Sequence, residues 1–264
     1  MSADYHKNTT HVSRSMLAVL ADSPRTYESR FVTGKPDEDD DNDNLSIGTG
    51  THAIALNDVL ALENIVVIPK EVLASNGAKS TNAYKEFAAK HAGKTLLKEE
   101  QKEICEKLAE QLDPSIGPFK RNPRALLEHE VYWTQCGIDC RAKLDLVVPM
   151  DDEVIVIDLK TAADIKPWKF RKAIIDRRLW LQDAHYSAGV QREFGLPVRF
   201  IFVAVHKTAP YRVRNYELNE SDKAEAARRH EELLESLAYR REHNDWSEIG
   251  EGDVITIEPL GEYW

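Results

Sequence analysis

The chain has 264 residues, of which 42% are hydrophobic and 30% are charged, and its formal net charge is −10 at pH 7. This length and composition predict one domain, residues 1–264, with a sizeable core, and the sequence lacks the apolar run of about 18 residues that spans a membrane. The acidity argues against a general polyanion binder, although it is compatible with a nucleic-acid channel that is locally positive or loaded with metal.

The cysteines and the N-terminus indicate the compartment. The chain has three cysteines, an odd number that is too small for a disulfide framework. Residues 1–7 lack the apolar core of a secretion signal. Both observations predict a protein of the reducing cytoplasm.

The N-terminal region is predicted to contain a short helix followed by a loop. Ser13 precedes apolar residues at helical spacing, so we expect an amphipathic helix that ends before Pro24. Residues 37–44 consist only of Asp, Glu and Asn. Such a run cannot form a core, and we expect a mobile, solvated loop there.

Three longer helices are predicted next. Glycine and threonine at 48–51 indicate a helix start, and apolar residues continue the helix to about Leu62, which places His52 in its first turn. Residues 80–92 and 98–112 form two further helical stretches with polar faces.

From residue 126 to residue 160 the hydrophobic period changes to two, which is typical of strands. Turns at 137–139 and 150–153 divide this region into a three-strand meander. After it we expect a partly helical segment at 164–178, a helix at 179–194, strands at 198–206 and 211–218, and a charged helix from its N-cap Ser221 to about His243. This order predicts an α/β fold with a central mixed β-sheet flanked by helices.

Two acidic residues and a lysine stand on consecutive strands of the meander. Asp145 lies on the second strand, and Asp158 and Lys160 lie on the third. Side chains alternate between faces along a strand, so Asp158 and Lys160 point the same way. Charges on so apolar a strand are costly unless they are paired or bound to a metal, and paired carboxylates suit Mg2+. Taken alone, the pair also fits a strand-end salt bridge.

Three more residues can join this group. His52 can approach the sheet from its helix, and Gln182 and Tyr186 lie four residues apart on one helix face. A lysine beside the carboxylates can orient or deprotonate a water, or neutralise charge on a phosphate. Each residue alone also fits a structural role, so the functional interpretation depends on the ordered set.

In this order the residues resemble the PD-(D/E)XK nuclease superfamily, in the branch with RecB-type motifs. That branch has a histidine after a Gly-rich helix start, an Asp, an Asp-x-Lys and a Gln-x-x-x-Tyr. The corresponding residues here are His52, Asp145, Asp158 with Lys160, and Gln182 with Tyr186. The segments 11–15, 23–27 and 157–162 extend the resemblance, most closely to the exonuclease VIII (RecE) nuclease domains and more distantly to the phage lambda exonuclease type.

The resemblance implies a PD-(D/E)XK nuclease core and an Mg2+-dependent exonuclease in which Mn2+ can substitute. Such an enzyme would degrade linear double-stranded DNA from its ends 5′→3′ by two-metal hydrolysis and leave 3′ single strands. The resemblance also implies a ring-shaped homo-oligomer, with a tetramer favoured, and a single-strand annealing protein as a partner in recombination. A non-catalytic DNA-end-binding or assembly module and a structure-specific endonuclease of the same fold are the alternatives.

The resemblance further implies residue roles. The metal ligands would be His52, Asp145, Asp158 and the Leu159 carbonyl. Lys160 would act on the attacking water, and Gln182 and Tyr186 would position the DNA strand near the scissile phosphate. Some relatives anchor an iron–sulfur cluster partly through a Cys-Pro where this chain has Ser23 and Pro24, so no cluster is expected.

Several assignments stay open at this level. Glu128 and Glu130 share a strand face, and either could supply an extra carboxylate. Arg14 and Arg25 could contact phosphates or form surface salt bridges. A basic group could line a DNA channel or form a solvated helix face; its members are Lys166, Lys169, Arg171, Lys172, Arg177 and Arg178.

Overall fold

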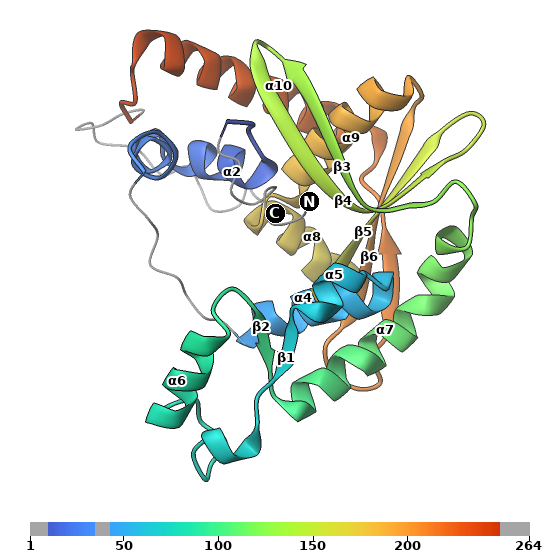
Figure 1. Cartoon of the computed structure of the whole chain (residues 1–264). Coiled ribbons are helices and arrows are strands. Elements are labelled where there is room, and N and C mark those ends of the chain that lie inside the picture. Colours follow the sequence, from blue (N-terminus) through green and yellow to red (C-terminus); the bar gives the residue numbers. More distant parts are fainter. Residues whose placement is uncertain (1–9, 35–42, 249–264) are drawn as a thin grey trace.

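A five-stranded mixed sheet forms the centre of the molecule, as the computed structural model shows for residues 10–34 and 43–248 (Figure 1). The strands lie in the order β3–β4–β5–β6–β7; β5 and β6 run parallel, and the other neighbours are antiparallel. Their bounds are β3 (Leu126–Gln135), β4 (Ile138–Pro149), β5 (Val154–Ala162), β6 (Val198–His206) and β7 (Val213–Tyr216). The predicted meander and the mixed α/β class are confirmed.

Helices cover both faces of this sheet (Figure 1). Their bounds are α2 (Arg14–Asp22), α3 (Pro24–Tyr27), α4 (Asp43–Leu56), α5 (Val59–Glu63), α6 (Asn82–Lys90), α7 (Glu99–Lys120), α8 (Pro167–Asp176), α9 (Leu179–Phe194) and α10 (Glu220–His243). Two short helical turns, η1 (Glu28–Val32) and η2 (Lys70–Val72), and a parallel pair of strands, β1 (Ile65–Val67) and β2 (Thr95–Leu97), complete the described elements. Within the described ranges, no helix has the length and apolar character needed to cross a membrane.

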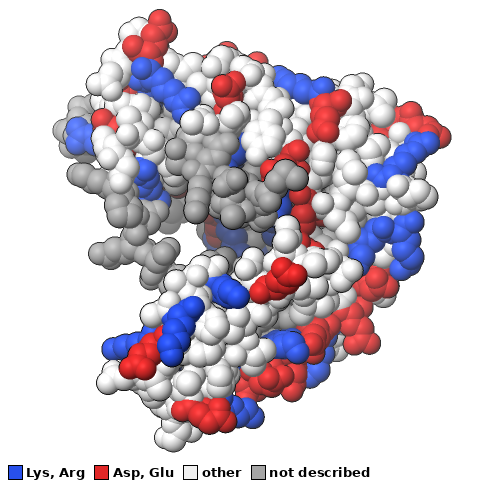
Figure 2. Space-filling view, in the orientation of Figure 1, with Lys and Arg blue, Asp and Glu red and all other residues white. Residues whose placement is uncertain are grey.

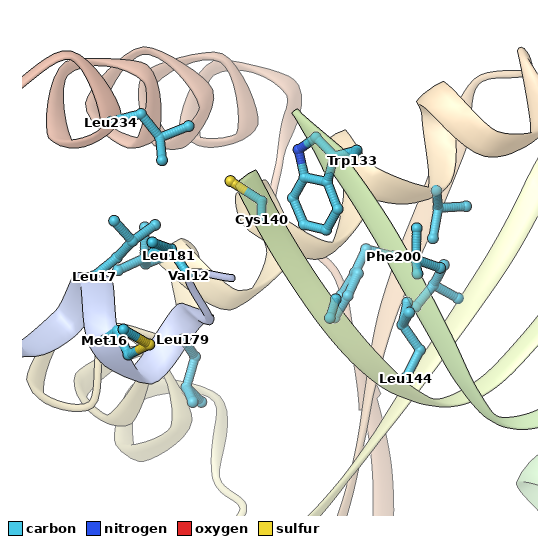
Figure 3. Close-up of a cluster of buried hydrophobic side chains, with 14 of the residues drawn as sticks. Val12, Met16, Leu17, Trp133, Cys140, Leu144, Leu179, Leu181, Phe200 and Leu234 are labelled. Carbon is cyan, nitrogen blue, oxygen red and sulfur yellow. The ribbon is translucent and has the colours of Figure 1, made fainter. Parts of the chain in front are cut away.

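The two faces of the sheet are buried in two separate cores. The first core lies between the sheet and α2, α9 and α10, and Figure 3 shows part of it, with Leu17 and Leu181 on the helix side and Trp133 on the strand side. The second core lies between the opposite face and the pair α4 and α7. Because both faces are covered, the central strand β5 is apolar at nearly every position, and Asp158 is almost fully buried at 3% exposure.

The glycine-rich segment lies inside α4, so the expected helix start at 48–51 and the first-turn position of His52 are wrong. The helix begins at Asp43, and His52 lies in its third turn. Gly50 packs so closely against α7 that a Cβ there would come within 2.9 Å of Cys105 Sγ. The glycine therefore permits close helix packing, a requirement that local sequence does not distinguish from a helix boundary.

Other boundaries differ in smaller ways. The hairpin turn consists of Cys136 and Gly137, which have φ values of 51° and 72°, so Ile138 and Asp139 already belong to β4. Asn219 caps α10 in place of Ser221. Helix α7 runs through Pro114 and ends at Lys120, because buried residues beyond the proline keep it against the sheet.

Two segments, the short strands β1 and β2 and the acidic run at 37–44, remain to be compared with the sequence prediction. Strands β1 and β2 were not predicted, because three residues are too few to establish a period of two. The acidic loop expected at 37–44 lies largely outside the described residues, and its last two positions, Asp43 and Asn44, belong to α4.

Candidate active site

Asp145 and Asp158 lie where β4 and β5 separate. The β4–β5 pairing ends at Leu146 and Ile157, so the next residues of the two strands are no longer joined by the ladder. Asp145 Oδ2 instead accepts a hydrogen bond of 2.7 Å from the backbone N–H of Leu159. Since the N–H and C=O of one strand residue point to the same edge, the Leu159 carbonyl also faces this opening.

Asp158 is held through both oxygens of its carboxylate. Gln182 Nε2 on α9 donates a 2.5 Å hydrogen bond to Asp158 Oδ1, and the Lys160 ammonium forms an ion pair with Oδ2. Asp158 and Lys160 therefore share a face, as the strand period predicts. The Lys160 side chain keeps 22% exposure, so it remains partly accessible to solvent.

His52 reaches the site from the opposite layer. Its Nδ1 lies 3.4 Å from Asp145 Oδ2, which joins α4 to the sheet at this point. Regular alternation along β4 also breaks at Asp145: Leu144 packs in the first core, whereas Leu146 packs in the second. The site thus lies at an opening between the layers, with His52 arriving from one face and Gln182 from the other.

The surroundings of the two carboxylates shift their pKa values in opposite directions. Burial raises the pKa of Asp158, and the nearby Asp145 charge adds to this effect against the opposing charge of Lys160. Burial also acts on Asp145, but His52, Lys160 and the Leu159 N–H outweigh it and hold its pKa below the ordinary value. For His52, burial is outweighed by the Asp145 carboxylate, which raises the imidazole pKa. These groups form one coupled charge cluster.

Glu128 is the extra carboxylate that lies beside this cluster. It falls opposite Asp145 in the β3–β4 register, between the pairs Leu127–Leu146 and His129–Leu144, and it has a φ of 50°. Burial raises its pKa, its Oε2 lies 2.5 Å from Lys143 Nζ, and the Asp145 charge also acts on it.

Glu130 has a different environment, although it stands only two residues away. It accepts a hydrogen bond of 3.1 Å from the exposed Tyr132 hydroxyl. Period-two alternation gives both glutamates the same face, so only the positive φ of Glu128 separates them, and that conformation has no sequence signal here.

Arg14 and Tyr186 lie on the α2–α9 side of the site. Tyr186 is half-buried and packs near Phe200. Arg14 donates to the Arg178 carbonyl at 2.7 Å and also to the Arg177 carbonyl, while its buried Nε has no hydrogen-bond partner. Burial lowers the Arg14 pKa, and the charges of Tyr186 and Asp158 oppose this shift, so the guanidinium belongs to the surroundings of the site.

Arg25 was the other arginine considered for phosphate contact. It lies on α3 with an exposed side chain. Its backbone N–H donates to Glu248 Oε1 at 3.4 Å. The sequence does not distinguish the two arginines, whereas in the fold Arg14 lies within the electrostatic surroundings of Asp158.

The donor set fits a hard divalent cation. The buried carboxylate of Asp158, the half-buried carboxylate of Asp145 and the His52 imidazole converge at the opening between β4 and β5, and the Leu159 carbonyl faces it. Asp158 Oδ2 is fully buried and accepts no hydrogen bond in the described structure, and the Lys160 ammonium forms an ion pair with it. Carboxylate and carbonyl oxygens are the ligands that Mg2+ prefers, and an imidazole also suits Mn2+.

Comparison with known structures supports the fold. A protein from Eubacterium rectale, solved under the name "Putative exonuclease", aligns with a TM-score of 0.60 and 12% identity over 97% of this chain and 92% of that chain. At this identity the match speaks for the fold alone. The structure of SSO0001 (TM-score 0.34, 20% identity, 70% and 83% of the chains) and that of VC1899 from Vibrio cholerae (0.25, 13%, 90% and 59%) are more distant.

A search among curated proteins finds no match. The family described as a PDDEXK-like domain of unknown function, DUF3799, matches residues 13–255, which include every site residue named above. The match covers nearly the whole chain, and the sheet carries Asp145, Asp158 and Lys160 together at one opening. This protein belongs to the DUF3799 family of PDDEXK-like domains and has the PD-(D/E)XK nuclease fold.

Proposed function

We propose that this protein is a metal-dependent exodeoxyribonuclease that degrades linear duplex DNA 5′→3′ and leaves 3′ single strands. The observation that carries the proposal is the convergence of Asp145, Asp158 and Lys160 with His52 and Gln182 at one opening of the sheet. PD-(D/E)XK nucleases typically use divalent metal ions, and the oxygen-rich donor set favours Mg2+ or Mn2+.

Asp145, Asp158, the Leu159 carbonyl and His52 would hold the metal ions. Bound Mg2+ stabilises charge on phosphate oxygens and lowers the pKa of water, and a pair of ions can serve both the incoming and the leaving oxygen. Gln182 orients Asp158 through its hydrogen bond, a type of supporting contact on which metal affinity commonly depends.

Lys160 has the chemistry to act on the reacting groups directly. Its ammonium can donate to the attacking water and so align it, or it can neutralise charge that develops on the phosphate. Gln182 and Tyr186 project from the same face of α9, and they would position the DNA strand beside the scissile phosphate. The His52 imidazole lies beside the Asp145 carboxylate and would complete one metal site.

The direction of digestion, the ring-shaped tetramer and a single-strand annealing partner are parts of the proposal that rest on the resemblance to exonuclease VIII. A non-catalytic DNA-end-binding or assembly module is disfavoured because the carboxylates and the lysine are all retained. A structure-specific endonuclease of the same fold is the remaining competitor.

Incubation with Mg2+ and matched linear and covalently closed circular duplexes tests the proposal. We expect linear DNA labelled at the 5′ end to release label early, EDTA to stop the reaction, and circles to remain intact. If linear DNA survives, the protein is not an exonuclease. If circles are cut, the endonuclease alternative is correct.

A further inference from the structure

A cavity of about 180 Å3 lies directly beside the catalytic lysine. One wall is the end of β5, from Lys160 to the loop that follows it, and the other wall is α8. Helix α8 contributes Lys169, Phe170 and Ala173, and Arg177 follows directly after the helix. Ala173 lies three or four residues from each of the other three, so all four can line the same side of the cavity. Figure 2 shows a hollow on this side of the molecule with Lys and Arg atoms at its bottom.

The α8 region is basic in an acidic protein. Residues 164–178 contain six Lys or Arg and two Asp, whereas the whole chain has a net charge of −10. Lys169 and Arg177 are exposed, and neither forms an ion pair in the described part of the chain. Burial lowers the pKa of Lys207, and the Arg177 charge adds to this effect, so Lys207 is a further cation close to Arg177. Cations gathered around a cavity favour an anionic ligand.

An exposed tryptophan stands beside these cations. Trp168 is 61% exposed, and Lys169 Nζ lies 4.4 Å from the centroid of its ring. A large aromatic ring that stays in solvent next to cations has the composition of a single-strand binding surface, in which rings stack on bases and cations follow the phosphates. Helix α8 also connects the strand that carries Lys160 to the helix that carries Gln182, so a ligand on it is next to the site.

We propose that α8 binds the DNA strand beside the scissile phosphate: Lys169 and Arg177 contact a backbone phosphate in the cavity, and Trp168 stacks on a base of the same strand. This inference rests on the proposed nuclease function and adds a substrate preference to it. Bases inside a duplex already stack on both of their neighbours, so the inference is that the strand to be cut is held unpaired where a base stacks on Trp168.

Steady-state kinetics on linear DNA test the tryptophan. Trp168→Ala should raise KM about 10-fold with kcat little changed, because stacking contributes to binding of the strand. Trp168→Phe keeps a ring and should recover most of the affinity. Tyr239→Ala is the matched control, because Tyr239 is also an exposed aromatic on a helix, at 54% exposure, and lies on α10. Its KM should equal that of the wild type.

Binding to single-stranded oligonucleotides with one abasic nucleotide tests stacking itself. In a Lys160→Ala background, one abasic position should weaken binding by the Trp168 protein and make no difference after Trp168→Ala. Lys169→Ala with Arg177→Ala should weaken binding to every oligonucleotide and reduce its salt dependence.

The outcomes separate this inference from the proposed function. A wild-type protein that cleaves no DNA refutes the proposed function. Normal wild-type cleavage with an unchanged KM in Trp168→Ala overturns the α8 inference alone. An unchanged KM together with a change of mass in light scattering would also overturn it, because Trp168 would then be a contact between protein subunits.

Discussion

At the scale of the residue, the two oxygens of Asp158 have different partners. Gln182 binds one oxygen through a neutral amide, and Lys160 binds the other through a charge. The neutral amide orients the carboxylate, whereas the ammonium carries a charge that could also act on a water or a phosphate. In the proposed mechanism, Gln182 therefore positions Asp158 and Lys160 acts on the reacting groups.

Lys160→Ala should reduce cleavage of linear DNA by at least about 100-fold, since it removes the cation aligned with the reacting groups. Metal and DNA binding should persist, because the carboxylates stay in place. Asp158→Ala should instead weaken metal binding, which calorimetry with Mn2+ measures. Lys107→Ala, an exposed lysine on α7, is the control and should cleave normally. Normal turnover in Lys160→Ala would remove Lys160 from the mechanism.

Asp183 lies next to Gln182 on α9, and the burial of its carboxylate reduces the stability of the folded protein at neutral pH. It is 5% exposed, Ser187 donates to its Oδ1 at 3.1 Å, and its Oδ2 has no hydrogen-bond partner. Burial raises its pKa to about 6. The folded state therefore holds a proton that the unfolded state has lost, and stability falls as pH rises from about 4 to about 6.

Asp183→Asn should therefore raise the free energy of unfolding at pH 7.5, by up to about 3 kcal/mol. The gain should disappear below about pH 4, where Asp183 is protonated in both states. Urea denaturation at several pH values measures it. Asp113→Asn, an exposed carboxylate paired with Arg121 on α7, should give no such pH-dependent gain. A gain that did not change with pH would contradict the burial of a charge at Asp183.

At the scale of the element, helix α9 carries Gln182 and Tyr186 and is held against the sheet by close packing. Gly189 on α9 faces Trp133 of β3, and a Cβ at this glycine would lie 2.6 Å from the indole ring. His185 adds a polar connection: its Nε2–H donates to the Arg141 carbonyl, and its Nδ1 lies 2.9 Å from His230 Nε2 on α10. The position of the site residues on α9 therefore depends on α9, α10 and the first core together.

Gly189→Ala should destabilise the fold by about 1–3 kcal/mol, because one methyl group must displace the Trp133 ring or the helix. Thermal unfolding monitored by tryptophan fluorescence would report both effects. Gly48→Ala is the matched control in α4, where a Cβ would meet only Thr161 Oγ1 at 3.4 Å. There the gain in helix propensity should leave stability equal or higher. A neutral Gly189→Ala would show that the packing of α9 is looser than described.

At the scale of the whole molecule, charge is distributed unevenly. The chain is acidic overall, yet the region around α8, beside the opening between β4 and β5, is basic. DNA would therefore be attracted to one side of the protein and repelled by most of the rest. A closed ring of subunits would keep such a protein on its substrate between cuts, which agrees with the proposed exonuclease.

Light scattering measures this assembly directly. We expect a mass of four times the 30.0 kDa chain, in accordance with the tetrameric ring proposed above. The mass should not change between low and moderate protein concentration if the ring is closed. A monomer at all concentrations would refute the ring and leave the chemistry of the site untouched.

Most of the local structure could be predicted from sequence, because its signals are periodic and short-range. The period of two placed Asp158 and Lys160 on one face of β5, and the helical spacing placed Gln182 and Tyr186 together on α9. The order of these residues also indicated the PD-(D/E)XK fold, which the family match confirms.

Only the tertiary structure decided how distant segments meet. It placed His52 Nδ1 3.4 Å from Asp145 Oδ2 and packed Gly50 of α4 against α7. It gave Glu128 a positive φ and an environment different from that of Glu130. It also formed the cavity between β5 and α8. Hydrophobic periodicity determines which face of an element is buried. It carries no information on which other element covers that face, because that depends on packing between residues far apart in the chain.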